Sequence, residues 1–331
     1  TASVFSAAYR LLFPEASISY SHPLPVQYNQ VTRPRRKGKP LQTNSVSIDG
    51  LDVRYWTQGS GSPLLLIHGL GEFMESWQYV IDDLSRHATV YALDLPGHGC
   101  SEKPPHDCSI EYYVRFILGF MDTFGISRAG LAGHSMGCPV CVSLAADYPE
   151  RIEKIILVDP GGFEKRVSVG YRLATVPILG NILLAPPAFI NHTTVKRGMR
   201  RQFLDVSAVP DDWVQAAVKH LKNPDRNDTL IKTIRHYTGV LNRRKPQEII
   251  DKARRVRLPA LIIHGRQDKV IPLDQGQKAW KLIENSELRI FDDCGHNPEI
   301  EKPKQFAEAV ISFLNEPPTD ENVTSEYAQG S

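Results

Sequence analysis

The sequence predicts an α/β fold with a mostly parallel central sheet, helices on both faces of the sheet and an inserted helical cap. Before and after a central block, short apolar runs of strand length alternate with helical segments, as in parallel sheets. Within that block the alternation stops and the segments favour helices. A serine with a glycine two positions away on either side joins one predicted strand to the next helix. The predicted parts are an N-terminal extension (1–44), a core (45–162 and 251–315), a helical cap (163–250) and an acidic tail (316–331).

Composition places the chain among ordinary soluble globular proteins. It has 331 residues, a hydrophobic fraction of 41%, a charged fraction of 23% and a formal net charge of +2. These values exclude a largely disordered or collagen-like chain. Because no run of about 18 apolar residues occurs, no transmembrane helix is predicted. Five cysteines, an odd number in a long chain, do not indicate a disulfide framework, so we expect a reducing compartment, cytoplasmic or organellar.

Positive charge gathers in the block that is predicted to be helical. Residues 163–257 hold 19 Lys and Arg against 8 Asp and Glu, a surplus of 11. Two interpretations are open: a solvated helical surface, or a surface that contacts anionic lipid or an anionic substrate group. No helix-turn-helix, zinc-finger or aromatic-basic RNA motif occurs, so no nucleic acid partner is expected.

The first 44 residues differ from the rest, with six basic residues, one acidic residue and five prolines. Their apolar residues share one helical face: Val4, Phe5, Ala8, Leu11 and Leu12. A helix of this kind followed by a basic run fits a peripheral helix on an anionic membrane, a segment docked on the domain or a targeting segment. The sequence leaves these three open, and it leaves the oligomeric state open as well.

The first elements form a hairpin, because Asp49-Gly50 accepts the positive φ angles of a tight turn between strands 45–48 and 51–57. The run 64–68, which is apolar up to its last residue His68, is typical of a strand covered on both faces. A helix over 77–84 and a strand over 89–93 follow.

The middle elements surround the glycine-flanked serine. Ser109 is a candidate N-cap for a helix over 112–124. Residues 130–133 form the end of a predicted strand. A helix over 137–147 follows and stops at Tyr148-Pro149, and the next strand spans 154–159. After the helical block the pattern resumes with strands over 259–264 and 287–291 and helices over 274–283 and 303–314.

The segment Gly133-His134-Ser135-Met136-Gly137 fits the G-x-S-x-G pattern in the strand–turn–helix setting that a nucleophile elbow requires. The serine sits in a sharp turn, and small residues two places on either side let strand and helix approach. The Ser135 hydroxyl then projects from the carboxyl edge of the sheet. The N–H of Met136, at the start of the helix, points into the same space.

A serine hydroxyl needs a base to take its proton. Of eleven histidines, His296 lies in a sizeable loop directly after the last predicted strand, where an imidazole can reach Ser135. Three others also stand at strand ends: His68, His134 and His264. His68 precedes a glycine loop suited to an oxyanion site. Because of its place in the sizeable loop, His296 is the predicted base.

The base in turn needs an acid that fixes its tautomer. Asp268 follows the predicted strand 259–264 and therefore stands at the same edge of the sheet as Ser135. Asp159, at the end of another strand, is the rival, and Asp292 and Asp293 are weaker candidates. The order Ser, Asp, His along the chain favours Asp268.

Backbone donors must stabilise the oxyanion that develops in the reaction, and one such donor is worth roughly 3–4 kcal/mol. The segment His68-Gly69-Leu70-Gly71 follows the strand 64–68. We predict that the N–H of Leu70 pairs with that of Met136, with Gly71 and Glu72 as alternatives to Leu70.

The sequence gives no support for redox, zinc or nucleotide-binding chemistry. Cys138 and Cys141 have C-x-x-C spacing but fall on the helix behind the serine, which indicates small core groups. No second cysteine pair or histidine cluster completes a tetrahedral zinc set, and neither a dinucleotide loop nor a P-loop motif occurs. We therefore expect no metal and no cofactor.

These motifs resemble those of the α/β-hydrolase superfamily, in its branch of capped single-domain esterases and related hydrolases. The resemblance covers about residues 45–314, and by analogy the block 163–250 is the cap over the active site. Cys138 stands where many relatives carry a second glycine, a difference expected to alter helix packing only. The motifs that carry the resemblance are His68 to Gly71, Asp94 to Ser101, Gly133 to Gly137, Gly265 to Asp268 and Gly295-His296.

The expected function is that of a serine hydrolase cleaving a small apolar carboxylic ester through an acyl-enzyme, with Ser135, His296 and Asp268 as the triad. Serine at position 135 disfavours epoxide or haloalkane hydrolysis, where relatives use aspartate. Thioesters, amides and the C–C bonds of β-diketones stay open, as do cofactor-free peroxidase or lyase chemistry on the same triad. The alternative from another class is a signal receptor with the hydrolase fold.

Overall fold

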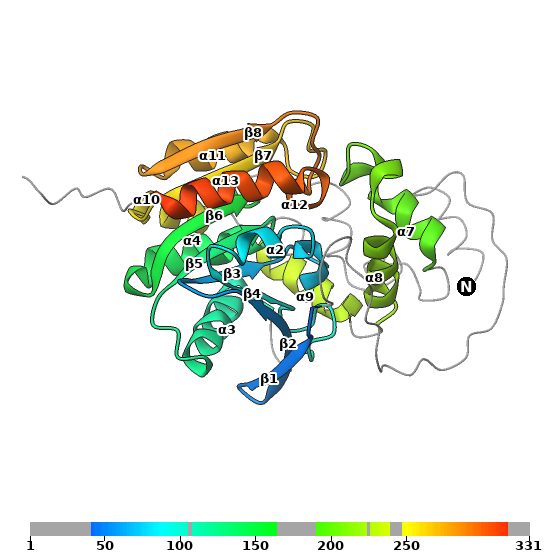
Figure 1. Cartoon of the computed structure of the whole chain (residues 1–331), viewed down its shortest axis with the longest axis horizontal. Helices are drawn as coiled ribbons and strands as arrows, with labels where there is room; N and C mark the ends of the chain where they lie inside the picture. The colour runs from blue at the N-terminus through cyan, green and yellow to red at the C-terminus, as the bar shows by residue number, and fades with distance from the viewer. Residues whose placement is uncertain (1–40, 105–107, 164–189, 224–225, 239–246, 317–331) are drawn as a thin grey trace, which may run out of the picture.

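A computed structural model describes residues 41–104, 108–163, 190–223, 226–238 and 247–316 (Figure 1). The apolar helix expected near the N-terminus and nearly all of the acidic tail lie outside these residues. Within the described ranges, no helix has the length and apolar character needed to cross a membrane.

The described strands form one eight-stranded sheet in the order β1-β2-β4-β3-β5-β6-β7-β8. The β1–β2 and β2–β4 pairs are antiparallel, and all other pairs are parallel. This confirms the predicted fold class, and the predicted strands agree with the observed ones to within two residues at either end. The strands are β1 Asn44–Ile48, β2 Leu51–Gln58, β3 Pro63–Ile67, β4 Thr89–Leu93, β5 Ala129–His134, β6 Ile152–Val158, β7 Ala260–Gly265 and β8 Ser286–Phe291.

Helices cover both faces of the sheet (Figure 1). The main α-helices of the core are α2 Ile81–Leu84, α3 Ile110–Thr123, α4 Gly137–Asp147, α10 Gln247–Arg255, α11 Leu273–Leu282 and α13 Pro303–Asn315. The side chains of α3, α4, α10 and α11 share one apolar cluster with one face of the sheet, and those of α2 and α13 share a second cluster with the other face. In β3, Leu65 faces the first cluster and Leu66 the second, which explains why the whole strand is apolar.

The segment predicted as one helix over 77–84 is two short pieces, the 3₁₀ helix η1 Met74–Trp77 and α2. Trp77, Val80 and Leu84 are all buried, and their spacing imitates a helical face. However, the N–H of Val80 donates to the carbonyl of Trp77, three residues back, so the backbone turns more tightly than in an α-helix. The single helix predicted there was wrong for this reason.

Strands β6 and β7 are neighbours in the sheet. The long chain segment that connects them is the insertion. It contains α7 His192–Gly198, η4 Met199–Arg201, η5 Val206–Ala208, α8 Asp211–Leu221 and α9 Arg226–Thr238. Helices α7 and α8 lie to one side of the sheet (Figure 1) and share a third apolar cluster with Phe73, which directly precedes η1. Helix α10 instead contacts α4 and α11 in the core, and the boundary expected at residue 250 falls inside this helix. The smaller elements η2 Pro149–Arg151 and α12 Pro298–Glu301 complete the described structure.

Candidate active site

Ser135 occupies the turn between β5 and α4 and has a φ of 51°, in the left-handed region that residues with a Cβ rarely adopt. Its N–H donates to the carbonyl of Val158 at 2.8 Å, which ties the turn to β6. A Cβ on Gly133 would lie 2.6 Å from the backbone of Gly137, and a Cβ on Gly137 would lie 2.4 Å from the carbonyl oxygen of Ile67. Both glycines are therefore required for this close approach of strand and helix.

His296 and Asp268 form a direct hydrogen bond. Nδ1 of His296 donates to Oδ2 of Asp268 at 2.6 Å, and both residues are buried. The other oxygen of Asp268 accepts the N–H groups of Val270 and Ile271. Burial alone would raise the pKa of Asp268, but His296 and these hydrogen bonds lower it, so the carboxylate stays charged. With its proton on Nδ1, His296 leaves Nε2 as an acceptor.

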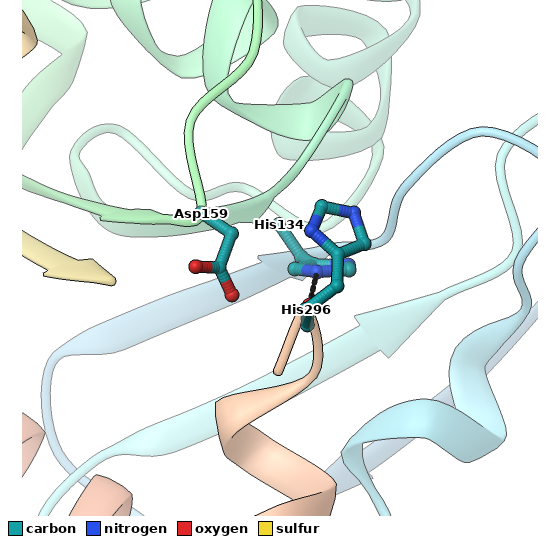
Figure 2. Close-up of side chains that lie close together, drawn as sticks. All are labelled: His134, Asp159 and His296. Atoms are coloured by element: carbon teal, nitrogen blue, oxygen red, sulfur yellow. Dashed lines mark hydrogen bonds between the residues drawn. The ribbon is translucent and has the colours of Figure 1, made fainter. Parts of the chain in front are cut away.

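Backbone contacts fix the loop that carries His296. Its N–H donates to the carbonyl of Gln202 at 2.6 Å, and its carbonyl accepts a hydrogen bond from Nε2 of His134 at 2.7 Å (Figure 2). Because His134 directly precedes Ser135, the same ring bonds the serine turn to the histidine loop. The rings of His134 and His296 lie 4.8 Å apart, centroid to centroid.

Asp159, the rival acid, stands at the end of β6 beside the two histidines (Figure 2). One of its carboxylate oxygens accepts the N–H of Gly265 at 2.9 Å, and the other is buried without a hydrogen-bond partner. Burial and the nearby charge of Asp268 raise the pKa of Asp159 well above its usual value, which favours the neutral acid. The bond from His296 therefore goes to the charged carboxylate of Asp268.

A buried ion pair that the sequence analysis missed lies beneath these groups. Nδ1 of His134 donates to Glu72 at 2.9 Å, while its Nε2 donates to the His296 carbonyl. Since both partners are acceptors, the ring must carry two protons and a positive charge. Burial would lower the pKa of His134, but Glu72 raises it well above the usual value. Burial would likewise raise the pKa of Glu72, but His134 lowers it to about 2. In the sequence, this ion pair was indicated only by a histidine next to the serine and by an acid in the glycine loop.

The glycine loop after β3 lies against the serine turn. A Cβ on Gly69 would lie 3.1 Å from the Cβ of Ser135, and the N–H of Gly69 donates to Glu72 at 3.0 Å. The ring of His68 bridges this loop to the next one, because Nδ1 donates to the Gly69 carbonyl and Nε2 accepts the N–H of Leu95. The N–H of Glu72 donates to the Gly69 carbonyl, so this alternative oxyanion donor is already occupied within its own turn.

Two sets of buried side chains among the described residues have the spacing of metal ligands: His134, Asp159 and His296, and Asp159, His264 and Asp268. In the first set, both ring nitrogens of His134 already donate hydrogen bonds. In the second, Asp268 accepts from His296, and Nε2 of His264 donates to the carbonyl of Ile271 at 3.0 Å. Both sets therefore include atoms that already take part in hydrogen bonds, while one carboxylate oxygen of Asp159, which belongs to both sets, has no partner.

The C-x-x-C pair lies behind the serine turn, as expected. Cys138 and Cys141 are both fully buried, and the sulfur of Cys138 donates to the carbonyl of Gly133 at 3.0 Å. Burial raises the pKa of both thiols. The two side chains therefore act as small packing groups between β5 and α4.

The chain is similar to proteins of one family over most of its length. The family described as alpha/beta hydrolase fold matches residues 62–303. An uncharacterized protein of Mycobacterium tuberculosis is 28% identical over 306 residues, which cover 90% of this chain and 87% of that protein. The 2-hydroxy-6-oxo-2,4-heptadienoate hydrolase of Pseudomonas putida is 28% identical over 274 residues, which cover 80% of this chain and 93% of that enzyme. A crystal structure of the meta-cleavage product hydrolase CumD is similar with a TM-score of 0.69 and 25% identity, over 83% of this chain and 98% of that one.

Proposed function

Because the chain belongs to the alpha/beta hydrolase fold family, we propose that it is a serine hydrolase with Ser135, His296 and Asp268 as its catalytic triad. The observation that carries the proposal is the 2.6 Å hydrogen bond between His296 and a charged Asp268, at the same edge of the sheet as the strained Ser135 turn. A serine nucleophile together with an imidazole held by a carboxylate is the set of groups that acyl transfer requires.

In the proposed reaction, Nε2 of His296 takes the proton of the Ser135 hydroxyl as its oxygen attacks the substrate carbonyl carbon. The N–H groups of Leu70 and Met136 stabilise the oxyanion that forms. The imidazolium then protonates the leaving group, and an acyl-enzyme remains. Water, deprotonated by His296, hydrolyses this ester and releases Ser135. Asp268 stabilises the imidazolium without taking its proton.

We propose a small apolar carboxylic ester as the substrate, bound between the core and the inserted helices, which would then form a cap. The support comes from the residues themselves: a serine nucleophile with a single histidine base suits an ester, whose leaving alkoxide is protonated by the imidazolium. The third apolar cluster, which packs α7 and α8 against Phe73 directly after the glycine loop, supports an attachment of the inserted helices to this end of the core.

Hydrolysis of a C–C bond next to a carbonyl group is the second candidate. A specific observation favours it: several similar proteins are named as hydrolases of 2-hydroxy-6-oxo-dienoates, at 28% identity over about four-fifths of this chain. The same triad serves such a reaction, but the leaving group is then a carbanion and must be protonated at carbon.

Labelling with a fluorophosphonate tests the nucleophile. The Ser135 oxygen displaces fluoride from phosphorus, so we expect one adduct, on the peptide that contains Ser135. Ser135→Ala should abolish labelling and lower kcat on an active ester by at least about 10⁴-fold. Ser143→Ala, which removes another buried hydroxyl on the neighbouring helix, is the matched control and should keep most of the activity.

The substrate class is tested by comparing kcat/KM on p-nitrophenyl esters, thioesters, aryl amides and a 2-hydroxy-6-oxo-dienoate. The ester proposal expects the esters to lead, and a higher value on the dienoate would favour the second candidate. A single burst of product with no further turnover would contradict both and indicate a receptor with the hydrolase fold. Labelling of a residue other than Ser135 would overturn the triad.

A further inference from the structure

A second buried cluster of charged groups lies between the core and helix α8. At its centre, Arg54 of β2 donates from Nε to Asp94 at 2.5 Å and from both terminal nitrogens to the two oxygens of Glu75 at 2.8 Å. Both acids are shielded, with 0% of the Asp94 side chain and 16% of the Glu75 side chain exposed. The proposed reaction uses none of these groups.

Helix α8 contributes a histidine to this cluster. Nε2 of His220 lies 3.3 Å from Glu75, and the ring packs 4.5 Å from the ring of Phe73, centroid to centroid. The same nitrogen is 3.4 Å from a terminal nitrogen of Arg54. The Glu75 carboxylate therefore faces both the Arg54 guanidinium and the His220 ring. His220 is 4% exposed and therefore fixed in this orientation.

The other nitrogen of His220 meets a thiol. Nδ1 lies 3.7 Å from the sulfur of Cys100, within hydrogen-bonding distance for sulfur, and Cys100 is exposed to solvent. The N–H of Cys100 donates to Asp94 at 2.8 Å, which fixes the backbone that carries the sulfur. The order thiol, imidazole, carboxylate is the arrangement that activates a cysteine nucleophile.

The charges around Cys100 favour the thiolate. Burial raises its pKa, but the hydrogen bond from His220 and the positive charges of Arg54, His220 and Lys219 lower it below the usual value. Burial lowers the pKa of His220, whereas Cys100 and Glu75 raise it to about 9. The negative charges of Glu75 and Asp94 face Arg54 and His220 and are neutralised by them. These contacts favour an ion pair between thiolate and imidazolium.

The remaining cysteines have no such setting. Cys108, Cys138, Cys141 and Cys294 are all buried. Burial raises the pKa of Cys138, Cys141 and Cys294. The chain therefore contains one exposed cysteine beside a histidine and four that are shielded from reagents in solution.

We propose that Cys100 is a nucleophile activated by His220 and Glu75, and that peroxides and other small soft electrophiles modify it. With hydrogen peroxide, the thiolate sulfur attacks one oxygen, the S–O bond forms as the O–O bond breaks, and sulfenic acid and hydroxide result. The sulfur is oxidised and the peroxide is reduced. With iodoacetamide, the sulfur displaces iodide from carbon. Neither step needs Ser135, so the inference stands independently of the proposed hydrolysis.

The test follows the alkylation rate of Cys100 against pH in the folded Ser135→Ala protein, by mass spectrometry of the peptide that contains it. Iodoacetamide is the probe, and glutathione and the urea-unfolded protein are measured alongside. The proposal expects the pH midpoint for Cys100 to lie below both references. A midpoint equal to or above that of the unfolded protein would overturn the proposal, whatever any variant does.

Variants then test whether His220 lowers the pH midpoint of Cys100. His220→Asn should raise the midpoint and slow alkylation of Cys100 near pH 7 by about three- to tenfold, a modest factor because thiolates of low pKa are individually weaker nucleophiles. His192→Gln, in another helix of the insertion and paired with Asp211, is the matched control and should leave the midpoint unchanged. A folded His220→Asn protein with the original midpoint would contradict the role of His220.

Peroxide completes the experiment. Brief treatment with hydrogen peroxide in the presence of dimedone should label Cys100 at least about tenfold more than any of the four buried cysteines, because sulfenic acid formation follows thiolate character and exposure. The same treatment of Cys100→Ser protein is the control for background. Equal labelling of Cys294 and Cys100 in folded protein would refute the selectivity that the cluster predicts.

Discussion

Two carboxylic acids stand near His296, and their surroundings give them opposite protonation states. Asp268 accepts two backbone N–H groups and the imidazole, so it is held as a carboxylate. Asp159 accepts one backbone N–H, keeps one oxygen unpartnered and is favoured as the neutral acid. At the scale of single residues, the neighbouring charges and hydrogen bonds of each carboxylate decide which acid can stabilise an imidazolium.

Substitution of the two acids by asparagine separates their roles. Asp268→Asn removes the charge and the preferred tautomer of His296, and kcat should fall by about 10⁴-fold. Asp159→Asn replaces a neutral acid by a neutral amide of the same shape, so kcat should stay within about tenfold of the parent value. The measurement is kcat on the best ester from the substrate panel. A larger loss in Asp159→Asn than in Asp268→Asn would reverse the assignment of the acid.

Glu299 predicts a pH dependence of stability. Its side chain is fully buried, both oxygens lack partners, and burial raises its pKa from the usual 4.5 to about 8. Between these two values the folded state holds a proton that the unfolded state has lost, so the free energy of unfolding falls as pH rises. This stabilisation is fully present below the unfolded pKa and is lost as pH rises through about 8.

Glu299→Gln should therefore leave the melting temperature nearly unchanged at pH 5 and raise it by about 8–10 °C at pH 9, because the glutamine needs no proton. Thermal unfolding of both proteins at the two pH values measures this. Glu308→Gln, at a side chain that is 66% exposed, is the control and should show no such pH-dependent difference. An equal shift at both pH values would indicate a packing effect unrelated to titration.

At the scale of elements, the serine turn depends on how closely β5, α4 and β3 approach one another. The turn holds Ser135 at positive φ, and the glycines on either side have no room for a methyl group. The helix α4 is then buried on all sides, which accounts for its small and apolar residues, including Cys138 and Cys141. The strain at Ser135 persists because the strands around it over-determine the turn.

Gly137→Ala should be among the most damaging single changes, because its methyl group would lie 2.4 Å from the backbone carbonyl oxygen of Ile67. We expect a loss of at least about 3 kcal/mol of unfolding free energy, or failure to fold. Gly198→Ala is the control: a Cβ there meets nothing within 4 Å, so stability should stay the same or rise by up to about 1 kcal/mol. Denaturant unfolding measures both. A stable, active Gly137→Ala protein would show that the turn can relax.

At the scale of the whole molecule, charge is distributed unevenly, although the formal net charge is only +2. The positive surplus of residues 163–257 appears in the described structure on α7 and η4, where Arg197, Arg200 and Arg201 are exposed. These elements lie to one side of the sheet (Figure 1). We propose that this surface contacts anionic lipid, where each arginine would contribute about 1 kcal/mol.

Vesicle sedimentation tests this surface. We expect the protein to bind vesicles that contain anionic phosphatidylglycerol at low salt, and to bind neutral phosphatidylcholine vesicles weakly or not at all. Binding should fall steeply at 0.5 M salt because of screening. The double variant Arg197→Gln/Arg200→Gln should bind about 30-fold more weakly. The double variant Arg86→Gln/Arg254→Gln, which has the same net charge and alters exposed arginines elsewhere, should bind like the parent. Equal binding of both double variants would assign any lipid affinity to another part of the chain.

The sequence alone determined the class of the fold and the order of its strands along the chain. Burial on both faces demands wholly apolar strands, the close approach of strand and helix at the serine turn demands glycines, and both demands are visible in a linear pattern. The place of Ser135 at the end of a strand and before a helix was determined in the same way, since that position depends only on neighbours in the chain. The split of the expected helix over 77–84 was not visible, because a 3₁₀ turn can bury the same spacing of side chains.

Only the tertiary structure decided which groups far apart in the chain share protons. It brought Asp268 to His296, left Asp159 with Gly265, and enclosed the ion pair of Glu72 and His134 beneath them. It also placed His220 of the insertion beside Cys100 of the core. Charge states and hydrogen-bond partners depend on burial and on distances across the sheet edge, and neither quantity is encoded in the spacing of residues along one strand or helix.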